Sequence, residues 1–202
     1  IELINQDEKF YYVKAGAGEV WHDLVMYCVN NNYAGLENLS LIPGSVGAGP
    51  IQNIGAYGVE LKDVLFELQA VNMEDLKTYT FTNAACKFGY RESVFKHELK
   101  NKYIITSVTY KLLKTPLLNT SYGAIEKELE AMGVTNKTIK DISQAVCNIR
   151  NSKLPNPLQI GNAGSFFKNP EVPRKKFEEL KNQFPDIVGY NVNTDTMKLA
   201  AG

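Results

Sequence analysis

Six glycines and two prolines lie within residues 35–58, and this density constrains the fold more than any other feature of the sequence. Glycine is unfavourable in the middle of helices and strands, so these residues predict loops rather than regular elements. Aliphatic residues are interspersed among the glycines, from Leu36 to Ile54, which is too many for a solvated linker. A glycine-rich segment with its own apolar anchors suggests backbone held close to a ligand. The alternative is a tight loop that packs only against the rest of the protein.

Backbone N–H groups between Pro43 and Gly58 are closely spaced and suit a phosphate or a ring system. Gly44, Gly47 and Gly49 form the pattern G-x-x-G-x-G, which is not the dinucleotide fingerprint G-x-G-x-x-G. The sequence also contains no phosphate loop of the G-x-x-x-x-G-K-[S/T] type and no G-x-S-x-G nucleophile elbow. The glycines therefore indicate a ligand-binding loop outside these motif classes.

Two further clusters contain residues that can act on a ligand. In residues 89–93, Arg91 follows Tyr90 and can present its planar guanidinium to a carboxylate or phosphate, unless it is a plain surface arginine. In residues 161–170, small residues surround Ser165 and allow a substrate to approach it, unless Ser165 only makes a turn.

Composition removes several classes of function. Lys plus Arg and Asp plus Glu both number 22, so the chain has a net charge of +0 and lacks the basic excess typical of nucleic-acid binding. His22 and His97 are the only histidines, which argues against a His-based triad or zinc site, and no metal is expected. Cys28, Cys86 and Cys147 are far apart and have no metal or redox spacing, and an odd number of cysteines is a poor disulfide framework. No apolar run approaches the roughly 18 residues of a membrane helix, so no membrane partner is expected.

Alternating patterns predict strands in three parts of the chain: two short strands in residues 1–18, a hairpin over 61–82 with its turn at Glu74 and Asp75, and a strand over 103–113. Each strand is expected to place one set of residues on the same face. These sets are Val64, Phe66, Leu68 and Ala70 in the hairpin, and Ile104, Thr106, Val108, Tyr110 and Leu112 in the long strand.

Apolar residues at helical spacing predict four helices. The first runs from Val20 to Val29, and two follow Pro116. Gly133 is expected to end the first of this pair, and Thr138 with Asp141 to cap the second. The fourth helix is expected to start at Pro173 and to direct Phe177, Leu180 and Phe184 inward.

Together the three clusters resemble the UDP-N-acetylenolpyruvoylglucosamine reductase family, the UDP-N-acetylmuramate dehydrogenases. The resemblance covers essentially the whole chain, and its most specific runs are Q-N-I-G-A-Y-G and N-A-G-S-F-F-K-N-P. The matching segments are residues 35–39 (GLENL), 42–47 (IPGSVG), 50–58 (PIQNIGAYG), 88–96 (FGYRESVFK) and 161–170 (GNAGSFFKNP).

The resemblance implies an α+β fold. An FAD-binding domain of the vanillyl-alcohol-oxidase/PCMH type would span residues 1–115, a connecting helical segment 116–140, and the start of an α+β substrate-binding domain 141–202. The positions implied to contact FAD are Pro43, Gly44, Ser45, Gly47, Ala48, Gln52, Asn53, Gly55, Ala56, Tyr57, Gly58 and Ile105.

Members of this family reduce FAD with NADPH and then pass hydride to the enolpyruvyl group of UDP-N-acetylglucosamine enolpyruvate, in peptidoglycan precursor synthesis. The resemblance implies that Arg91 stabilises the negative charge that develops beside the substrate carboxylate, and that Ser165 protonates the α-carbon. The implied substrate-binding residues are Tyr90, Arg91, Tyr122, Lys153, Ser165, Lys168 and Asn169. We therefore expect a cytoplasmic, monomeric oxidoreductase of cell-wall biogenesis, with a part in cell shape and division.

Two family features have no counterpart in the sequence: the G-x-G-S-N flavin-phosphate loop and the catalytic Glu that pairs with the arginine. We expect the chain to be part of a longer protein, to bind FAD weakly by itself and to have little reductase activity alone. One alternative is a non-catalytic remnant that only binds a UDP-sugar or a partner protein. Another is a related flavin oxidase with a different substrate, against which the motif around Ser165 argues.

Overall fold

The computed structural model describes residues 1–156, 159–161 and 167–200. It divides into two compact units, Ile1–Lys153 and Leu154–Gly202, which are described separately below. Helices and antiparallel sheets occur in both units, so the predicted α+β class is confirmed.

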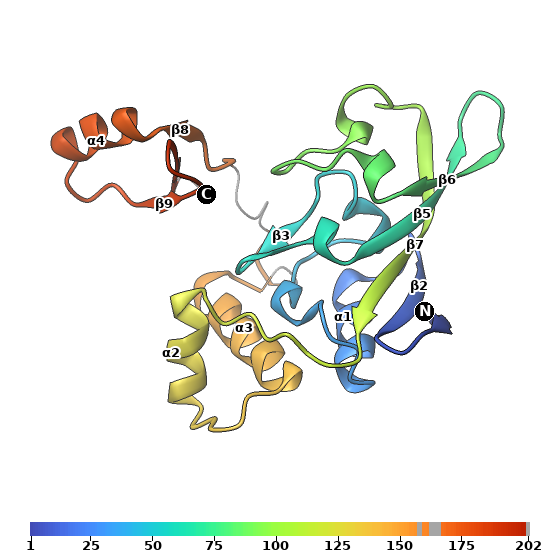
Figure 1. Cartoon of the computed structure of the whole chain (residues 1–202), viewed down its shortest axis with the longest axis horizontal. Coiled ribbons are helices and arrows are strands. Elements are labelled where there is room, and N and C mark those ends of the chain that lie inside the picture. Colours follow the sequence, from blue (N-terminus) through green and yellow to red (C-terminus); the bar gives the residue numbers. More distant parts are fainter. Residues whose placement is uncertain (157–158, 162–166, 201–202) are drawn as a thin grey trace. The chain divides into compact units, whose positions relative to one another are not determined.

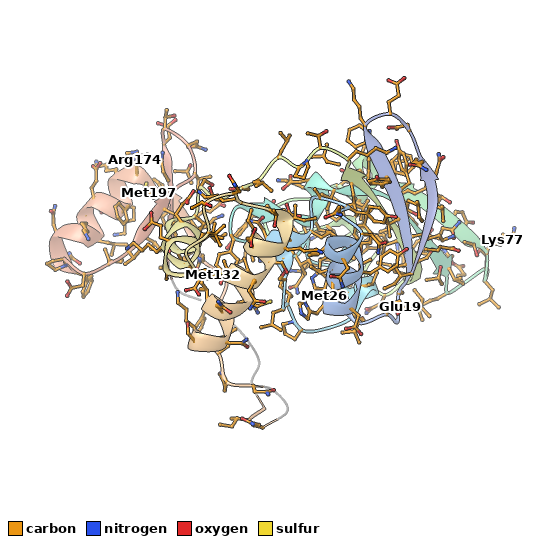
Figure 2. The ribbon with its side chains drawn as sticks, turned by 90° about the horizontal axis from the view of Figure 1, so that it is seen from below. Glu19, Met26, Lys77, Met132, Arg174 and Met197 are labelled. Carbon is orange, nitrogen blue, oxygen red and sulfur yellow. The ribbon has the colours of Figure 1, made fainter. Side chains whose placement is uncertain are left out.

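A five-stranded antiparallel sheet forms the frame of the first unit (Figure 1). Its strand order is β1 (Glu2–Gln6), β2 (Phe10–Gly16), β7 (Tyr103–Leu113), β5 (Leu65–Asn72) and β6 (Thr78–Thr82). The predicted strands and hairpin are confirmed, and Lys77 lies in the connection between β5 and β6 (Figure 2). Since β2 and β7 pair over seven residue positions, the second and last strands of the expected FAD-binding part lie beside each other.

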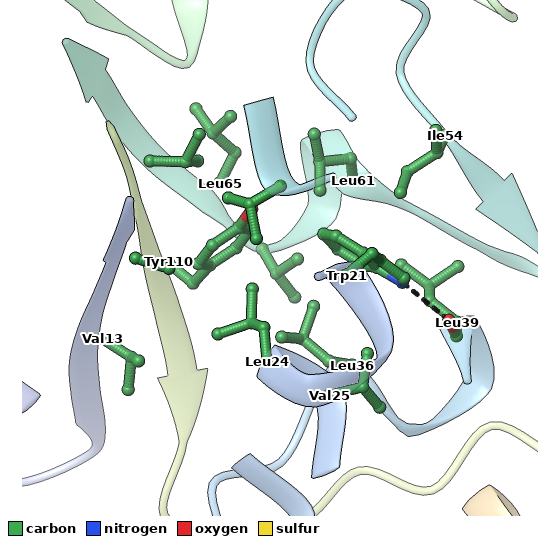
Figure 3. Packing of buried hydrophobic residues seen from close by; sticks show 14 of the residues in the cluster. Val13, Trp21, Leu24, Val25, Leu36, Leu39, Ile54, Leu61, Leu65 and Tyr110 are labelled. Atoms are coloured by element: carbon green, nitrogen blue, oxygen red, sulfur yellow. Dashed lines mark hydrogen bonds between the residues drawn. The ribbon is translucent and has the colours of Figure 1, made fainter. Parts of the chain in front are cut away.

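Helix α1 (Trp21–Asn30) buries its apolar stripe against this sheet, as its periodicity predicts. Trp21 lies within the cluster and its Nε1–H donates to the Leu39 oxygen at 2.8 Å (Figure 3). Its ring meets Tyr110 of β7 edge-on at a centroid distance of 6.1 Å. The core therefore connects α1, the sheet and the glycine-rich segment in one apolar cluster.

The buried faces of β5 and β7 differ from the predicted ones at three residues. Phe66 is 43% exposed and Ile104 is 57% exposed, whereas their neighbours Leu65 and Ile105 are buried. Thr106 is exposed as well. Strand pairing explains all three errors, because the register shifts by one residue between Leu65 and Glu67 and again where Gln69 and Ala70 pair with Ser107 and Ile105. A β-bulge adds one unpaired residue and so reverses the alternation of faces along the strand.

The glycine-rich segment forms no long regular element, as predicted. It consists of turns together with short elements: the 3-10 helices η1 (Glu37–Leu39) and η2 (Val46–Ala48), and the two-residue strands β3 (Gly55–Ala56) and β4 (Val59–Glu60). Further 3-10 turns follow at η3 (Leu61–Asp63), η4 (Ala84–Cys86) and η5 (Val94–Lys96).

Helices α2 (Gly123–Ala131) and α3 (Ile139–Lys153) pack side by side through a small apolar cluster of their own (Figure 1). Gly133 adopts a φ of 70° just after α2, and the Thr138 and Asp141 side chains bond each other's backbone N–H groups at the start of α3. Both predicted boundaries are therefore confirmed. The first unit continues through α3, so the predicted functional division at residue 141 lies inside a compact unit and stays a prediction.

The second unit contains a three-stranded antiparallel sheet in the order β8 (Glu171–Pro173), β10 (Thr196–Leu199) and β9 (Gly189–Asn191), together with helix α4 (Arg174–Gln183). Helix α4 starts at Arg174, one residue after the predicted start, and Pro173 is the N-cap residue that ends β8. Phe177 and Leu180 are partly buried, but Phe184 is 58% exposed, so its predicted inward orientation is wrong. The helix has already ended at Gln183, so Phe184 leaves the helical face that the spacing assumes. Among the residues described, no helix has the length and apolar character needed to cross a membrane.

Candidate functional site

The segment Pro43–Ala48 is fixed against the turn between β2 and α1. The backbone N–H groups of Val46 and Gly47 donate to the oxygens of Glu19 and Ala17, each at 2.9 Å. A Cβ atom on Gly47 would lie 2.6 Å from the Ala17 Cβ, so only glycine permits this approach. The sequence therefore places a glycine here because two backbone segments meet.

The outer side of this segment is open to a ligand. Pro43, Gly44 and Ala48 are exposed, and Ser45 is partly exposed. A Cβ atom on Gly44 would meet no heavy atom within 4 Å, and the φ of Gly44 is 113°. A rigid, exposed edge of small residues suits a large ring system or a phosphate that must lie against the backbone.

Asn53 joins the glycine-rich segment to the turn that carries Arg91. Its side chain is fully buried and its φ is 46°, an uncommon backbone conformation for a residue other than glycine. Nδ2 donates to the Gly89 oxygen at 2.9 Å and to Glu60 Oε2 at 3.1 Å, while Oδ1 accepts from the Lys62 N–H at 2.9 Å. Thus Asn53 connects two motifs that lie 36 residues apart in sequence.

Arg91 stands at the corner of a tight turn closed by two hydrogen bonds between Gly89 and Glu92. Its φ is 56°, and its guanidinium turns back towards the glycine-rich segment. NH2 donates to the Gly55 oxygen, and NH1 lies 3.4 Å from the Asn53 oxygen. The guanidinium carbon also lies 5.2 Å from the centroid of the Tyr90 ring. A Cβ atom on Gly55 would lie 2.9 Å from Arg91 NH1 and 2.9 Å from the backbone oxygen of Val59, so glycine is required beside the guanidinium.

A carboxylate completes the surroundings of Arg91. Glu60 Oε1 lies 3.9 Å from Arg91 NH1, and Oε2 lies 2.8 Å from Lys62 Nζ. The hydrogen bond that the Lys62 ammonium donates to the Glu60 carboxylate raises the pKa of Lys62 above its ordinary value. We call Asn53, Gly55 and Glu60 the guanidinium cradle, because these three residues surround the Arg91 head group.

Tyr57 and Tyr122 form a second group in the first unit. Their rings meet edge-on at a centroid distance of 5.3 Å, and the side chain of Tyr122 is 39% exposed. Burial raises the pKa of the Tyr57 phenol, while the positive charge of Arg150 and a hydrogen bond from it oppose that rise. Asn38 Nδ2 donates to the oxygens of Tyr57 and Asn119 at 3.1 and 2.9 Å, which ties the two tyrosine-bearing segments together.

The remaining predicted site residues are less concentrated. Gln52 is exposed, Ala56 and Gly58 follow in the same turn, and Ile105 lies in the buried part of β7 beside the bulge. Lys153 is exposed at the last turn of α3. Lys168 and Asn169 belong to the second unit, and Ser165 lies outside the described residues. The structure thus brings together the glycine-rich segment, Tyr90 and Arg91, while the roles of all these residues stay predictions.

Sequence reasoning missed Glu60, Lys62 and Arg150 as neighbours of the predicted site. Each is a charged residue in a stretch whose local pattern resembles ordinary surface sequence. Only the fold reveals Glu60 beside Arg91, because these residues are 31 positions apart and meet through a turn. The Asn53 that lies between them was predicted, but as a ligand contact rather than as an internal connection.

Comparison with known proteins defines the class of the fold. A family model described as an FAD binding domain matches residues 2–79. The crystal structure of a UDP-N-acetylenolpyruvylglucosamine reductase from Thermus caldophilus aligns with a TM-score of 0.55 at 24% identity, over 78% of this chain and 48% of that one. The chain therefore has the α+β fold of an FAD-binding protein.

Similarity to curated proteins identifies the particular family of FAD-binding proteins to which the chain is related. The UDP-N-acetylenolpyruvoylglucosamine reductase of Flavobacterium johnsoniae is 52% identical over all 202 residues, and that of Amoebophilus asiaticus is 49% identical over 201 residues. The chain spans about 60% of the length of these relatives. The resemblance inferred from the motifs is confirmed: over its whole length the chain is related to the UDP-N-acetylenolpyruvoylglucosamine reductases.

Proposed function

We propose that the protein containing this chain is an FAD- and NADPH-dependent oxidoreductase that reduces UDP-N-acetylglucosamine enolpyruvate to UDP-N-acetylmuramate. The observation that carries the proposal is the meeting of Arg91 with the glycine-rich segment. It holds a cation against the backbone oxygens of Asn53 and Gly55, in the same segment that exposes small residues at Pro43 to Ala48. The identity of the relatives supports the same reaction. When bound, FAD supplies the hydride chemistry.

In this proposal, the backbone of residues 43–48 and 52–58 holds the flavin, and Ile105 lines its apolar side. Arg91 binds the substrate carboxylate and stabilises the negative charge that spreads into it during reduction. Ser165 delivers a proton to the α-carbon of the substrate. Tyr90, Tyr122 and Asn169 contact the substrate, and the cationic Lys153 and Lys168 suit its diphosphate.

The proposed location, oligomeric state and cellular role rest on the family resemblance. We propose that the enzyme acts in the cytoplasm as a monomer, in peptidoglycan synthesis and hence in cell shape and division. Size-exclusion chromatography with light scattering tests the monomer, and a stable dimer at micromolar concentration would contradict it.

The two half-reactions test the assigned roles in the full-length protein. We expect Ser165→Ala and Arg91→Ala to leave flavin reduction by NADPH nearly unchanged and to slow flavin oxidation by substrate by about 100-fold or more. Arg91→Lys should recover only part of the rate, because an ammonium cannot reproduce the planar fork. Lys87→Ala, which removes an exposed lysine paired with Glu98, is the matched control and should change neither step. Equal losses in both half-reactions would remove these residues from their roles.

A flavin spectrum tests the cofactor separately from the substrate. We expect the full-length protein to be yellow and to oxidise NADPH when the substrate is added, and the 202-residue chain alone to retain little flavin. A full-length protein that binds the UDP-sugar without flavin would favour the non-catalytic alternative.

A further inference from the structure

We propose that Glu60 is a positioning residue for Arg91, which fixes one edge of the guanidinium so that its other N–H groups address an anionic ligand in one orientation. The nature of that ligand, a substrate carboxylate, rests on the function proposed above. The geometric part of the inference rests only on the contacts within the guanidinium cradle.

Arg91 is held at three points on the terminal nitrogens of its side chain. Two are neutral carbonyl oxygens, from Gly55 and Asn53. The third is the carboxylate of Glu60, 3.9 Å from NH1. Glu60 is the only charged group among the three. Its attraction to the guanidinium is therefore the contact that depends most strongly on where the positive charge lies.

Glu60 is itself held in place. Oε2 accepts from Asn53 Nδ2 at 3.1 Å and pairs with Lys62 Nζ at 2.8 Å. The Glu60 backbone N–H donates to Asp63 Oδ2 at 2.8 Å, within the capping box of η3. The Glu60 side chain is only 23% exposed. A carboxylate fixed by a buried amide, a lysine and a capped turn can orient its neighbour because its own freedom is small.

The net charge of the site allows a loss of orientation to be distinguished from a loss of attraction for the ligand. The charges of Arg91, Lys62 and Glu60 add up to one positive charge, so the group attracts an anion while Glu60 is ionised. In Glu60→Gln the sum rises to two positive charges, and the same anion should be attracted at least as strongly. Loss of orientation should therefore reduce kcat without raising KM, whereas local unfolding would raise KM and reduce kcat together.

A double-mutant cycle in the full-length protein tests the inference. Rates of flavin oxidation by the enolpyruvyl substrate are measured in wild type, Glu60→Gln, Arg91→Ala and the double variant, with flavin reduction by NADPH as the internal reference. We expect Glu60→Gln to slow substrate reduction about tenfold at unchanged or lower KM, and to add less than about twofold in the Arg91→Ala background. The same factor in both backgrounds, or no slowing in the single variant, would overturn the inference.

Asp63→Asn is the matched control. It weakens the capping contact to the Glu60 backbone but leaves the Glu60 carboxylate and its contact with Arg91 in place. We expect its rates to stay within about twofold of wild type. A tenfold loss in this control would mean that general stability of η3, rather than the Glu60 charge, governs the rate.

Side-chain NMR of Arg91 gives a readout that needs no reductase activity. The guanidinium N–H signals, assigned through Arg91→Lys, should be separate in the wild type because rotation is restricted, and should average in Glu60→Gln. Gly55→Ala should give the same averaging, because its Cβ would lie 2.9 Å from both Arg91 NH1 and Glu60 Cγ and would push the two side chains away from their positions. If the wild type reduces no substrate, but the Arg91 signals are separate in the wild type and averaged in Glu60→Gln, the proposed function fails and the positioning role stands. Identical signals in wild type and Glu60→Gln would refute the positioning role.

Discussion

The apolar core around Trp21 and the guanidinium cradle around Arg91 belong to the same compact unit, yet different interactions hold them. The core depends on buried area and shape, which several apolar residues can supply. The cradle depends on single polar atoms and on the absence of a Cβ atom at Gly55, which few substitutions can reproduce. Core changes should therefore act mainly on stability, and cradle changes should act on the site before they unfold the protein.

The largest effect is expected at the centre of the core. Trp21→Ala removes a side chain that is 1% exposed, and should lower the free energy of unfolding by about 3–5 kcal/mol. Trp21→Phe is the control: it keeps much of the packing but loses the hydrogen bond to the Leu39 oxygen, so a smaller loss of about 1–3 kcal/mol is expected. Urea denaturation measures both. Equal losses in the two variants would mean that the hydrogen bond, not the packing, dominates this region.

An intermediate effect is expected at Asn53, which is a polar residue of the cradle but is as fully buried as the core residues. Asn53→Ala removes three hydrogen bonds and leaves their partners without Asn53, so we expect a loss of about 2–3 kcal/mol in unfolding free energy. Asn53→Gly tests the backbone contribution, because glycine adopts the φ of 46° without strain.

Asn31→Ala is the matched exposed control for Asn53. The exposed Asn31 side chain donates from Nδ2 to the Tyr27 oxygen at 2.8 Å at the end of α1, and the loss of this bond should change stability by only about 0.5 kcal/mol. If Asn53→Ala is as mild as Asn31→Ala, the cradle is not held by its polar contacts and the comparison between the two regions fails.

The smallest effect, and the only one expected to stabilise, lies at a polar atom inside the core. The Tyr110 hydroxyl is fully buried and, within the described part of the chain, has no hydrogen-bond partner. Burial raises the pKa of this phenol well above its ordinary range, so it stays protonated. Tyr110→Phe should leave stability unchanged or raise it by up to about 1 kcal/mol, measured by thermal and urea unfolding. A loss greater than about 1 kcal/mol would reveal a partner for the hydroxyl.

Local sequence patterns predict several elements of this fold because their causes lie within a few residues. The α3 stripe of Ile139, Ile142, Val146 and Ile149 is buried as its spacing requires, and Thr138 with Asp141 caps the helix. Both features follow from helical geometry alone. Likewise, the density of glycine in residues 35–58 is sufficient to exclude long helices and strands there.

Strand faces could not be predicted in the same way, because they depend on the neighbouring strand. The alternation assigned to Phe66 and Ile104 ignores the two register shifts between β5 and β7, and each shift reverses the face. A bulge is a property of the pair of strands, so the sequence of one strand does not reveal it.

By itself, the sequence determined the approximate positions of the helices, the boundaries at Gly133 and at Thr138 with Asp141, the glycine-rich loop and the family resemblance, since these reside in short contiguous runs. Only the tertiary structure decided which strand residues face the core, and that Asn53, Gly55 and Glu60 surround Arg91. These contacts join positions about 30 to 40 residues apart, so their energies depend on how the intervening chain folds back.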